Sequence, residues 1–266
     1  MKVHHLNCGS MRPPFTPGGL VCHVLLLETP TGLALVDTGF GLKDAADPRV
    51  RIGTGRHLMR PALDEAETAI SQVTALGFDP GDVRDVVLTH FDVDHTGGLA
   101  DFPRARVHLT VSERDAVYAP EKKADKRRYR PVQRSHDPEV VPHDVAQGDA
   151  WRGFASAVEL TGIGDGVVLI GLDGHSRGHA AVAVDAGDHW VLHAGDAFYH
   201  HGRIDGTGRE PRVLTAMERI VAADWAKVQA NHERLADLWA AGDPDVLLVN
   251  SHDPTLLFGA QLVSSA

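Results

Sequence analysis

The sequence predicts an α/β protein, because short apolar segments alternate along the chain with segments of helical periodicity. The chain has 266 residues, of which 43% are hydrophobic and 23% are charged, an ordinary globular composition that is long enough to bury a full core. Residues 63–76 repeat apolar side chains at helical spacing and stop at Gly77. Residues 85–89 and 166–171 are short and largely apolar, which is typical of buried strands. In such an alternation helices cover the strands.

The remaining elements follow from local signals taken in chain order. Pro30-Thr31-Gly32 is a turn that joins two apolar strands. Residues 112–115 have the pattern of a capping box and predict the start of a helix, while Asp224 and Gly242 predict the two ends of a long one. The predicted strands are 21–28, 33–37, 85–89, 105–110, 166–171, 181–185, 190–194 and 246–250, and the predicted helices are 63–76, a short one from 112, and 224–241.

Residues 120–150 are the least regular part of the chain. Residues 121–134 are rich in lysine and arginine and are interrupted by Pro131. A charge run of this kind is typical of a solvated insertion; the alternative is a mobile wall of an active-site cleft, with Tyr129 as a contact. We expect residues 1–266 to form a single domain with an insertion or mobile segment around 120–150.

Composition excludes several kinds of partner and location. The 26 Lys and Arg against 36 Asp and Glu give a net charge of −10, which argues against nucleic acid as a partner. The longest apolar runs, such as 24–27, are far below the roughly 20 residues of a membrane span, and the first residues contain no apolar signal segment. Cys8 and Cys22 make no disulfide framework, which predicts a cytoplasmic protein. The 17 histidines are the unusual feature and the first indication of metal chemistry.

Histidine or aspartate follows four of the predicted strands at the point where each strand ends. These residues are His90 after 85–89, His175 after 166–171, Asp196 after 190–194 and His252 after 246–250. Side chains at the carboxyl ends of strands in an open α/β sheet converge on one crevice. Imidazole and carboxylate together suit Zn, Fe or Mn. The sequence therefore predicts a metal cluster at this end of the sheet.

The segment His90–His95 is the strongest local signal. In an extended chain His90 and Asp92 point to the same side, and a turn must follow before Asp94 and His95 reach a second position. The next residues, Thr96-Gly97-Gly98, supply a permissive backbone for that turn. One segment can therefore give two ligands to one ion and two to its neighbour. The plain alternative is a helix N-cap with surface charges.

These motifs resemble those of the metallo-β-lactamase superfamily, and they stand in the family's order. Residues 89–98, THFDVDHTGG, are similar to the metal motif H-x-H-x-D-H, and residues 174–179 are similar to the G-H-T-x-G-H element. Gly195-Asp196 resembles the pair that carries the bridging carboxylate, 251–253 the terminal histidine, and 35–39 the early V-D-T-G. The resemblance spans residues 20–255, and it implies a four-layer αββα sandwich.

The resemblance also implies a dinuclear metal site. Its ligands are His90, Asp92 and His175 for one ion, Asp94, His95 and His252 for the other, and Asp196 as the bridge. Asp37 matches a residue that orients the ligand loop without binding metal, and His179 matches one that packs beside His175. A hydroxide held by the two ions is expected to attack the substrate. Asp94 is then the catalytic residue that passes a proton to the leaving oxygen.

Asp92 departs from the family motif, which has histidine at this position. An Asp Oδ reaches about as far from Cα as a His Nδ1, so Asp92 can still bind. With Asp94, Asp196 and one hydroxide, it brings the ligand charge to −4, which cancels the +4 of two divalent ions, whereas the family motif leaves +1. We expect two divalent ions, zinc by resemblance, with weaker Lewis acidity and a shift toward Mn or Fe.

Tyr199 directs the prediction toward lactones. It stands three residues after Asp196, as in the N-acyl homoserine lactonase branch, where a tyrosine at that offset faces the substrate carbonyl. A phenol there can donate to the developing oxyanion. The apolar candidates for an acyl pocket, or for plain core, are Met11, Phe15, Phe40 and Phe198. We expect a quorum-quenching lactonase that acts on a small N-acyl homoserine lactone-like molecule. We expect it to be a monomer or homodimer that binds neither a membrane nor nucleic acid.

Other functions use the same cluster. A glyoxalase II-like thioesterase shares the metals and carries basic residues for the glutathione carboxylate, a role that 122–134 can serve. A phosphodiesterase needs a basic groove, which the net charge disfavours. Diiron oxidoreductases of the family have an acidic ligand where Asp92 stands, but they usually carry an appended flavodoxin-like domain, for which the chain has no room. A non-catalytic scaffold agrees least with seven competent ligands.

Overall fold

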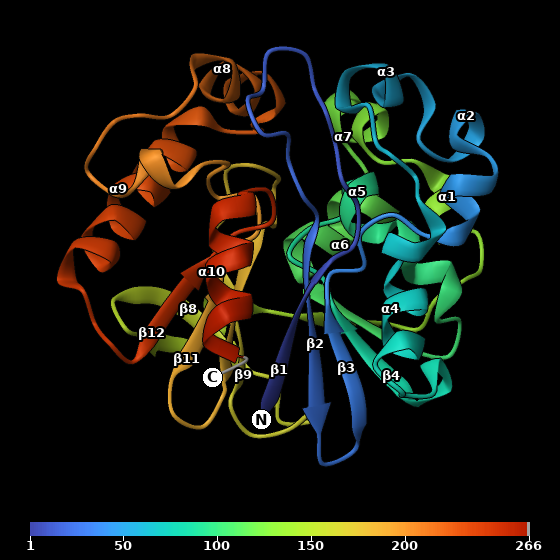
Figure 1. The fold of residues 1–266 in the computed structure, drawn as a ribbon, viewed down its shortest axis with the longest axis horizontal. Coiled ribbons are helices and arrows are strands. Elements are labelled where there is room, and N and C mark those ends of the chain that lie inside the picture. Colours follow the sequence, from blue (N-terminus) through green and yellow to red (C-terminus); the bar gives the residue numbers. More distant parts are fainter. Residues whose placement is uncertain (265–266) are drawn as a thin grey trace.

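The computed structural model describes residues 1–264, whose strands form two six-stranded sheets facing each other across the centre of the molecule (Figure 1). The first sheet has the order β1-β2-β3-β4-β5-β6, and the second has the order β12-β11-β10-β9-β8-β7. The first half of the chain therefore builds one sheet and the second half builds the other.

The first sheet combines an antiparallel and a parallel part. Its strands are β1 (Lys2–Asn7), β2 (His23–Thr29), β3 (Gly32–Val36), β4 (Val83–Val87), β5 (Arg106–Thr110) and β6 (Val140–His143). The strands β1, β2 and β3 pair antiparallel, and β3 through β6 pair parallel. Parallel neighbours need crossover connections, and these carry helices here.

The second sheet brings three strand ends to one edge. Its strands are β7 (Asp149–Trp151), β8 (Phe154–Glu159), β9 (Val167–Gly171), β10 (Ala180–Asp185), β11 (Trp190–His193) and β12 (Val246–Val249). Both β9 and β11 run antiparallel to β10, and β12 runs parallel to β11. The carboxyl ends of β9, β11 and β12 consequently lie at the same edge.

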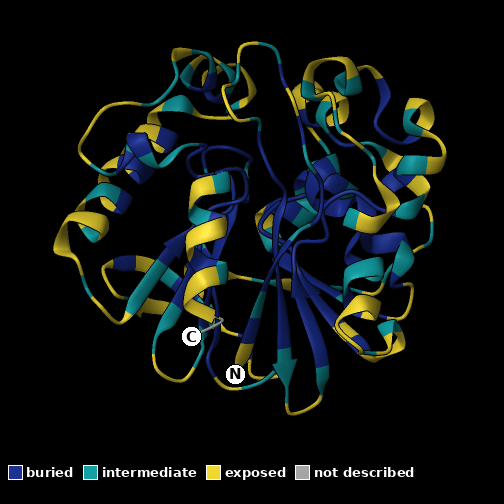
Figure 2. Ribbon diagram, viewed as in Figure 1, coloured by how far each residue is buried: buried dark blue, intermediate teal, exposed yellow. Residues whose placement is uncertain are grey.

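Helices cover the outer face of each sheet, which completes four layers and confirms the predicted αββα sandwich (Figure 2). Successive residues of a strand alternate between layers: Leu26 packs under the helices, whereas Leu25 and Leu27 pack between the sheets. On the outside, Val73 and Val117 cover the first sheet and Leu235 covers the second. The sheets are therefore buried on both faces.

The helices lie between the strands in chain order. They are α1 (Leu42–Ala46), α2 (Pro48–Arg51), α3 (Arg56–Met59), α4 (Ala69–Ala75), α5 (Val93–Thr96), α6 (Val111–Tyr118), α7 (Lys123–Arg128), α8 (Arg212–Val221), α9 (Trp225–Ala241) and α10 (Pro254–Ser264). Helices α4 and α6 belong to the layer on the first sheet, and α9 to the layer on the second. No helix within residues 1–264 is both long enough and apolar enough to cross a membrane.

Two helix predictions need correction. The helix predicted at 63–76 is confined to α4, because Leu63 has φ +55° and Thr68 caps a new start by accepting the Ser71 N–H. The capping box predicted at 112–115 is wrong, although a helix does begin there. Thr110 is the N-cap, and its Oγ1 accepts the N–H of Glu113 at 3.1 Å. The Glu113 carboxylate is turned inward instead of back to the cap.

The segment 120–150 is built into the fold. It contains α7, a 3-10 turn at Pro131–Arg134, and β6, which extends the first sheet by pairing parallel with β5. Tyr129 is buried, and its hydroxyl donates to Glu113 Oε1 at 2.9 Å. Local patterns missed β1, β6, β7 and β8, because their alternation is weak or mixed with polar residues.

Candidate metal centre

The predicted ligand residues meet at one end of the sandwich, between the two sheets. Those that follow β4 of the first sheet are His90, Asp92, Asp94 and His95, and those that follow β9, β11 and β12 of the second are His175, Asp196 and His252. Asp92 is the N-cap of the short helix α5, whose first turn carries Asp94 and His95. Loops from two facing sheets, rather than from one open sheet, gather these residues, so the site lies between the two central sheets of the expected sandwich.

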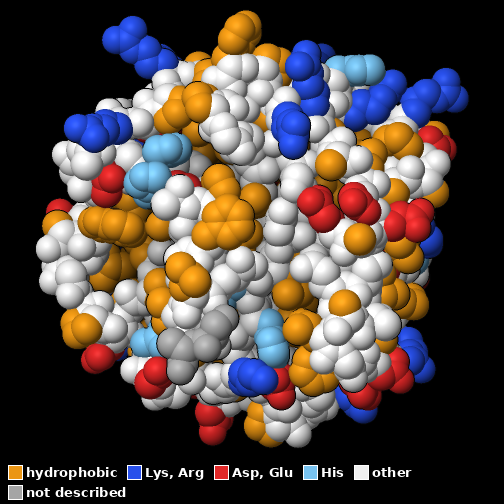
Figure 3. All heavy atoms as spheres, viewed as in Figure 1, with side chains coloured by type: hydrophobic (Ala, Val, Ile, Leu, Met, Phe, Trp, Pro, Cys, Tyr) orange, Lys and Arg blue, Asp and Glu red, His pale blue; other side chains and the backbone are white. Residues whose placement is uncertain are grey.

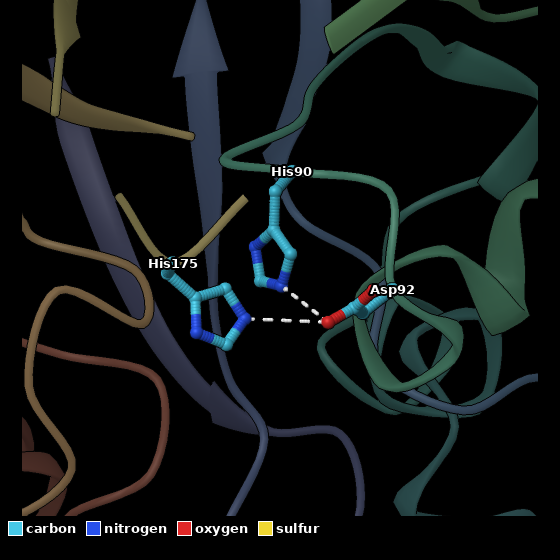
Figure 4. A group of neighbouring side chains, drawn as sticks. All are labelled: His90, Asp92 and His175. Atoms are coloured by element: carbon cyan, nitrogen blue, oxygen red, sulfur yellow. Dashed lines mark hydrogen bonds and ion pairs between the residues drawn. The ribbon is translucent and has the colours of Figure 1, made fainter. Parts of the chain in front are cut away.

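His90, Asp92 and His175 form a first group (Figure 4). Asp92 Oδ2 lies 3.3 Å from His90 Nε2 and 3.2 Å from His175 Nε2. Both imidazoles are buried, and the Asp92 side chain is 21% exposed. The three ligand atoms point toward one another, an arrangement that can hold one cation.

Asp94, His95 and His252 form a second group, and Asp196 lies between the two. The Nε2 atoms of His95 and His252 lie 3.9 and 3.7 Å from Asp94 Oδ2. Asp196 Oδ1 lies 3.3 Å from His95 Nε2, and its Oδ2 lies 3.1 Å from His252 Nε2 and 3.5 Å from His175 Nε2. Asp196 thus contacts both groups, as a bridging carboxylate must.

The donor set fits divalent cations. Nε2 of His90, Nε2 of His95 and Oδ1 of Asp196 are buried without a hydrogen-bond partner in residues 1–264, and such atoms are costly unless something pairs with them. Burial lowers the pKa of His90 to about 3, so this imidazole is neutral and keeps its lone pair. Burial opposes charge on His95 as well, but Asp196 and Asp37 hold its pKa well above the usual value. The carboxylates therefore favour positive charge here.

Asp37 fixes the orientation of His95. It adopts φ 59° at the end of β3, a left-handed conformation that aspartate tolerates better than most residues. Its Oδ2 accepts His95 Nδ1–H at 2.8 Å, and its two oxygens also accept the N–H and hydroxyl of Thr89. With Nδ1 held in this way, Nε2 of His95 faces the group.

His179 and Gly195 fix the position of Asp196. His179 Nε2 accepts the Asp196 N–H at 2.9 Å, and Nδ1 donates to the Leu172 carbonyl at 3.0 Å. Both ring nitrogens are thus engaged outside the two groups. Gly195 has φ +56°, and a Cβ there would lie 2.6 Å from His179 Nε2, so the loop that delivers Asp196 requires glycine.

Glu113 joins the loops of the two sheets, and local sequence patterns did not single it out for this role. Its buried carboxylate accepts the Phe91 N–H at 2.9 Å, the Gly178 N–H at 3.0 Å, and the hydroxyls of Ser176 and Tyr129 at 2.7 and 2.9 Å. These donors come from the loop after β4, the loop after β9, and the end of α7. The only signal in the sequence was the predicted helix start at 112–115, which says nothing of these partners.

Arg128 also escaped sequence reasoning, because it stands inside a charge run. It lies at the end of α7 and donates to both carboxylate oxygens of Asp92, from Nε at 2.7 Å and from Nη2 at 2.6 Å. The predicted segment around 120–150 therefore reaches the metal centre, but through Arg128 rather than Tyr129.

Tyr199 packs against the centre from the second sheet's side. Its ring centroid lies 5.1 Å from that of His252 and 6.2 Å from that of His175. Burial raises the pKa of Tyr199 well above its usual value, so the hydroxyl remains a donor. No residue in 1–264 hydrogen-bonds that hydroxyl, whereas the backbone N–H donates to Glu218 Oε1 at 2.6 Å. Burial raises the pKa of Glu218 to about 8.

A cavity of about 530 Å³ opens onto Asp92 and Asp94. Its walls come from α3, α7 and the end of α8. Several lysine and arginine side chains lie along the upper part of the molecule in Figure 3. The larger aliphatic residues of the lining are Ile52, Leu58, Met59, Val93, Ile220 and Val221. None of the four predicted acyl-pocket residues lines it: Met11 and Phe40 pack beside Tyr199, Phe198 is buried under α9, and Phe15 is exposed.

His200 and His201 lie outside the two groups, in a third cluster with Asp253. His201 Nδ1 lies 2.6 Å from Asp253 Oδ2, which also accepts the His201 N–H. His193 is fully buried, and its Nε2 lies 2.9 Å from the His23 carbonyl.

The protein has two facing sheets, and loops from both sheets bring imidazoles and carboxylates together at one end. This arrangement is that of a metal-dependent hydrolase. The chain belongs to the metallo-beta-lactamase superfamily, whose sequence profile matches residues 17–241. It is 52% identical over 257 residues to a Mycobacterium tuberculosis relative named "Probable metallo-hydrolase Rv2300c", covering 96% of this chain and 81% of that one. It is a metallo-hydrolase.

Lactonases are among its more distant relatives. The N-acyl homoserine lactonase AttM of Agrobacterium fabrum is 36% identical over 96 residues, which cover 36% of each chain. A crystal structure of a Bacillus thuringiensis AiiA mutant, with N-decanoyl-L-homoserine bound at its active site, superposes with a TM-score of 0.69 at 19% identity, covering 97% of this chain and 95% of that one. At that identity the second likeness shows the fold alone.

Proposed function

We propose that the protein opens the ring of an N-acyl homoserine lactone-like substrate with two divalent cations. The observation that carries this proposal is Tyr199, whose unpartnered hydroxyl belongs to a ring packed against His252 and His175. A phenol held beside two metal-ligand imidazoles is placed to donate to a carbonyl oxygen as negative charge develops on it. The AttM relative supports the same substrate class.

The residues have separate tasks in this reaction. His90, Asp92 and His175 would hold one cation, Asp94, His95 and His252 would hold the other, and Asp196 lies between the two groups. Two divalent cations, zinc or a harder ion, supply Lewis acidity and lower the pKa of bound water. Asp94 lies on the cavity side of the centre and passes a proton to the leaving alkoxide. The apolar walls formed by Leu58, Met59 and Ile220 receive the acyl chain.

The proposal is tested by metal analysis combined with a substrate panel. We expect purified protein to hold two ions per chain and to hydrolyse N-acyl homoserine lactones, which release acid that a pH indicator reports. Thioesters and phosphodiesters in the same panel test the other functions. Faster hydrolysis of thioesters or phosphodiesters than of lactones would contradict the proposed substrate class. A purified chain that holds no ion would contradict the proposed metal-dependent mechanism. The cytoplasmic location and the monomeric or homodimeric state stay predictions.

Tyr199→Phe is expected to slow lactone turnover by about 1–3 kcal/mol of transition-state stabilisation, the scale of a lost oxyanion donor. The effect falls mainly on kcat, because the hydroxyl acts on charge that develops in the transition state. Steady-state kinetics with metal content measured in parallel checks it. Tyr118→Phe is the matched control, since the Tyr118 hydroxyl is buried without a hydrogen-bond partner in residues 1–264 and the ring contacts Phe91 and Arg134 rather than a ligand residue. An unchanged rate in Tyr199→Phe would remove the reason for preferring lactones.

A further inference from the structure

Arg128 contacts two residues of the first ligand group, Asp92 and His175. Its guanidinium forms a two-pronged ion pair with Asp92, Nε to Oδ1 at 2.7 Å and Nη2 to Oδ2 at 2.6 Å. Its Nη1 donates to the carbonyls of His175 and Val221, each at 2.8 Å. Paired forks of this kind are among the stronger polar contacts in proteins. Arg128 is thus firmly held, with its side chain 16% exposed.

The same guanidinium engages atoms that the first cation needs. Arg128 Nη2 lies 2.6 Å from His175 Nε2, and because arginine can only donate, this nitrogen is the acceptor. Asp92 Oδ2, the other partner of Nη2, is the oxygen that lies nearest to both His90 and His175. A lone pair that accepts a hydrogen bond cannot also bind a cation. Arg128 therefore occupies the single lone pair of His175 Nε2 and one of the lone pairs of Asp92 Oδ2, and so contacts two of the three ligand atoms of the first group.

The second group has no such competitor. Within residues 1–264 no lysine or arginine forms an ion pair with Asp94 or Asp196, whose ion-pair partners are histidines. The two groups consequently differ in what a cation must displace. At the second group the imidazole and carboxylate atoms contact only one another, as His252 Nε2 contacts Asp196 Oδ2 at 3.1 Å, whereas a cation at the first group meets a guanidinium.

Asp92 explains why an arginine can lie here. Histidine, which the family motif has at this position, offers no pair of acceptor oxygens and carries no charge when neutral. Aspartate offers two acceptor oxygens and a negative charge. The charges of Asp92 and Arg128 cancel, so the pair is neutral overall, as a neutral imidazole is. The departure from the motif and the arginine of α7 thus form one unit, although they stand 36 residues apart.

We propose that Arg128 competes with the cation of the first group, so that this position binds a divalent ion more weakly than the second does. This inference rests on the metal binding of the proposed function. Filling the first position requires the guanidinium to leave His175 Nε2, because that nitrogen has a single lone pair. Because Arg128 also lines the 530 Å³ cavity, that displacement changes the wall of the cavity.

Calorimetric titration of chelator-treated protein with Zn²⁺ alone tests the inference. We expect wild type to bind one ion tightly and a second at least tenfold more weakly, and Arg128→Gln to tighten the weaker step at least tenfold. Lys126→Gln is the matched control, since it removes the same charge from an exposed position of α7. It should change neither step by more than twofold.

Thermal unfolding gives a second readout with opposite signs. Arg128→Gln should lower the Tm of the metal-free protein, because the ion pair is lost, and should enlarge the rise in Tm that Zn²⁺ produces. Arg128→Lys keeps the charge but cannot make the two-pronged ion pair, so both its metal-free Tm and its rise in Tm with Zn²⁺ should lie between those of wild type and Arg128→Gln. This variant also tests the inference if Arg128→Gln does not fold. Equal affinities in wild type, or weaker binding in Arg128→Gln, would overturn the inference while leaving the proposed function intact. Failure of every variant and of wild type to bind Zn²⁺ would overturn both.

Discussion

We expect Asp196→Ala to lose both metal ions and hydrolytic activity together. The Asp196 carboxylate lies within 4.0 Å of ring nitrogens of four histidines, His90, His95, His175 and His252. Since even the outer partners of metal ligands contribute about 10–100-fold to affinity, loss of a shared ligand is expected to exceed about 100-fold. Elemental analysis of the purified variant and hydrolysis rates measured on the same sample check the result.

Two further variants separate metal loss from misfolding. Asp196→Asn keeps the shape of the side chain and removes its charge, so it should fold like wild type and still bind metal poorly. Asp188→Ala removes an aspartate whose side chain is 87% exposed on the same half of the chain, and it should keep full metal content. Two ions per chain in Asp196→Ala would contradict the assignment of Asp196 as the bridge.

Glu113→Ala is expected to lower the free energy of unfolding by about 3–5 kcal/mol, the scale of breaking a buried charged network. Its carboxylate accepts four hydrogen bonds, from Phe91, Ser176, Gly178 and Tyr129. Alanine leaves these donors buried without their partner and leaves a cavity at the junction of three segments. Urea denaturation of the metal-free protein measures the change directly.

The same substitution should reach the metal centre. Phe91 and Ser176 are the neighbours of His90 and His175, so loosening them should weaken the first group more than the second. Glu121→Ala is a matched control at an exposed position, and its effect should stay within about 0.5 kcal/mol. A loss below about 1 kcal/mol in Glu113→Ala would mean that water or rearranged neighbours satisfy the four donors.

Local patterns in the sequence determined the α/β class and the residues that can bind metal. Strands such as β4 and β9 are short apolar runs, and burial on both faces requires nothing more specific of them. His90, Asp92, Asp94 and His95 stand within six residues of chain, so their spacing is visible without a fold. The family resemblance then supplied the sandwich, and the structure brought the distant His175 and His252 to the same place.

Tertiary structure alone decided which side chains surround those ligands. In the sequence Glu113 was one residue of a predicted helix start, and Arg128 was one cation in a solvated run, because both patterns are local and common. Their partners stand at 91, 176 and 178 for Glu113 and at 92 and 175 for Arg128, across segments that only the packing of two sheets brings together. The free energy of such contacts depends on burial and on a distance of a few ångströms, and neither quantity is carried by the order of residues along the chain.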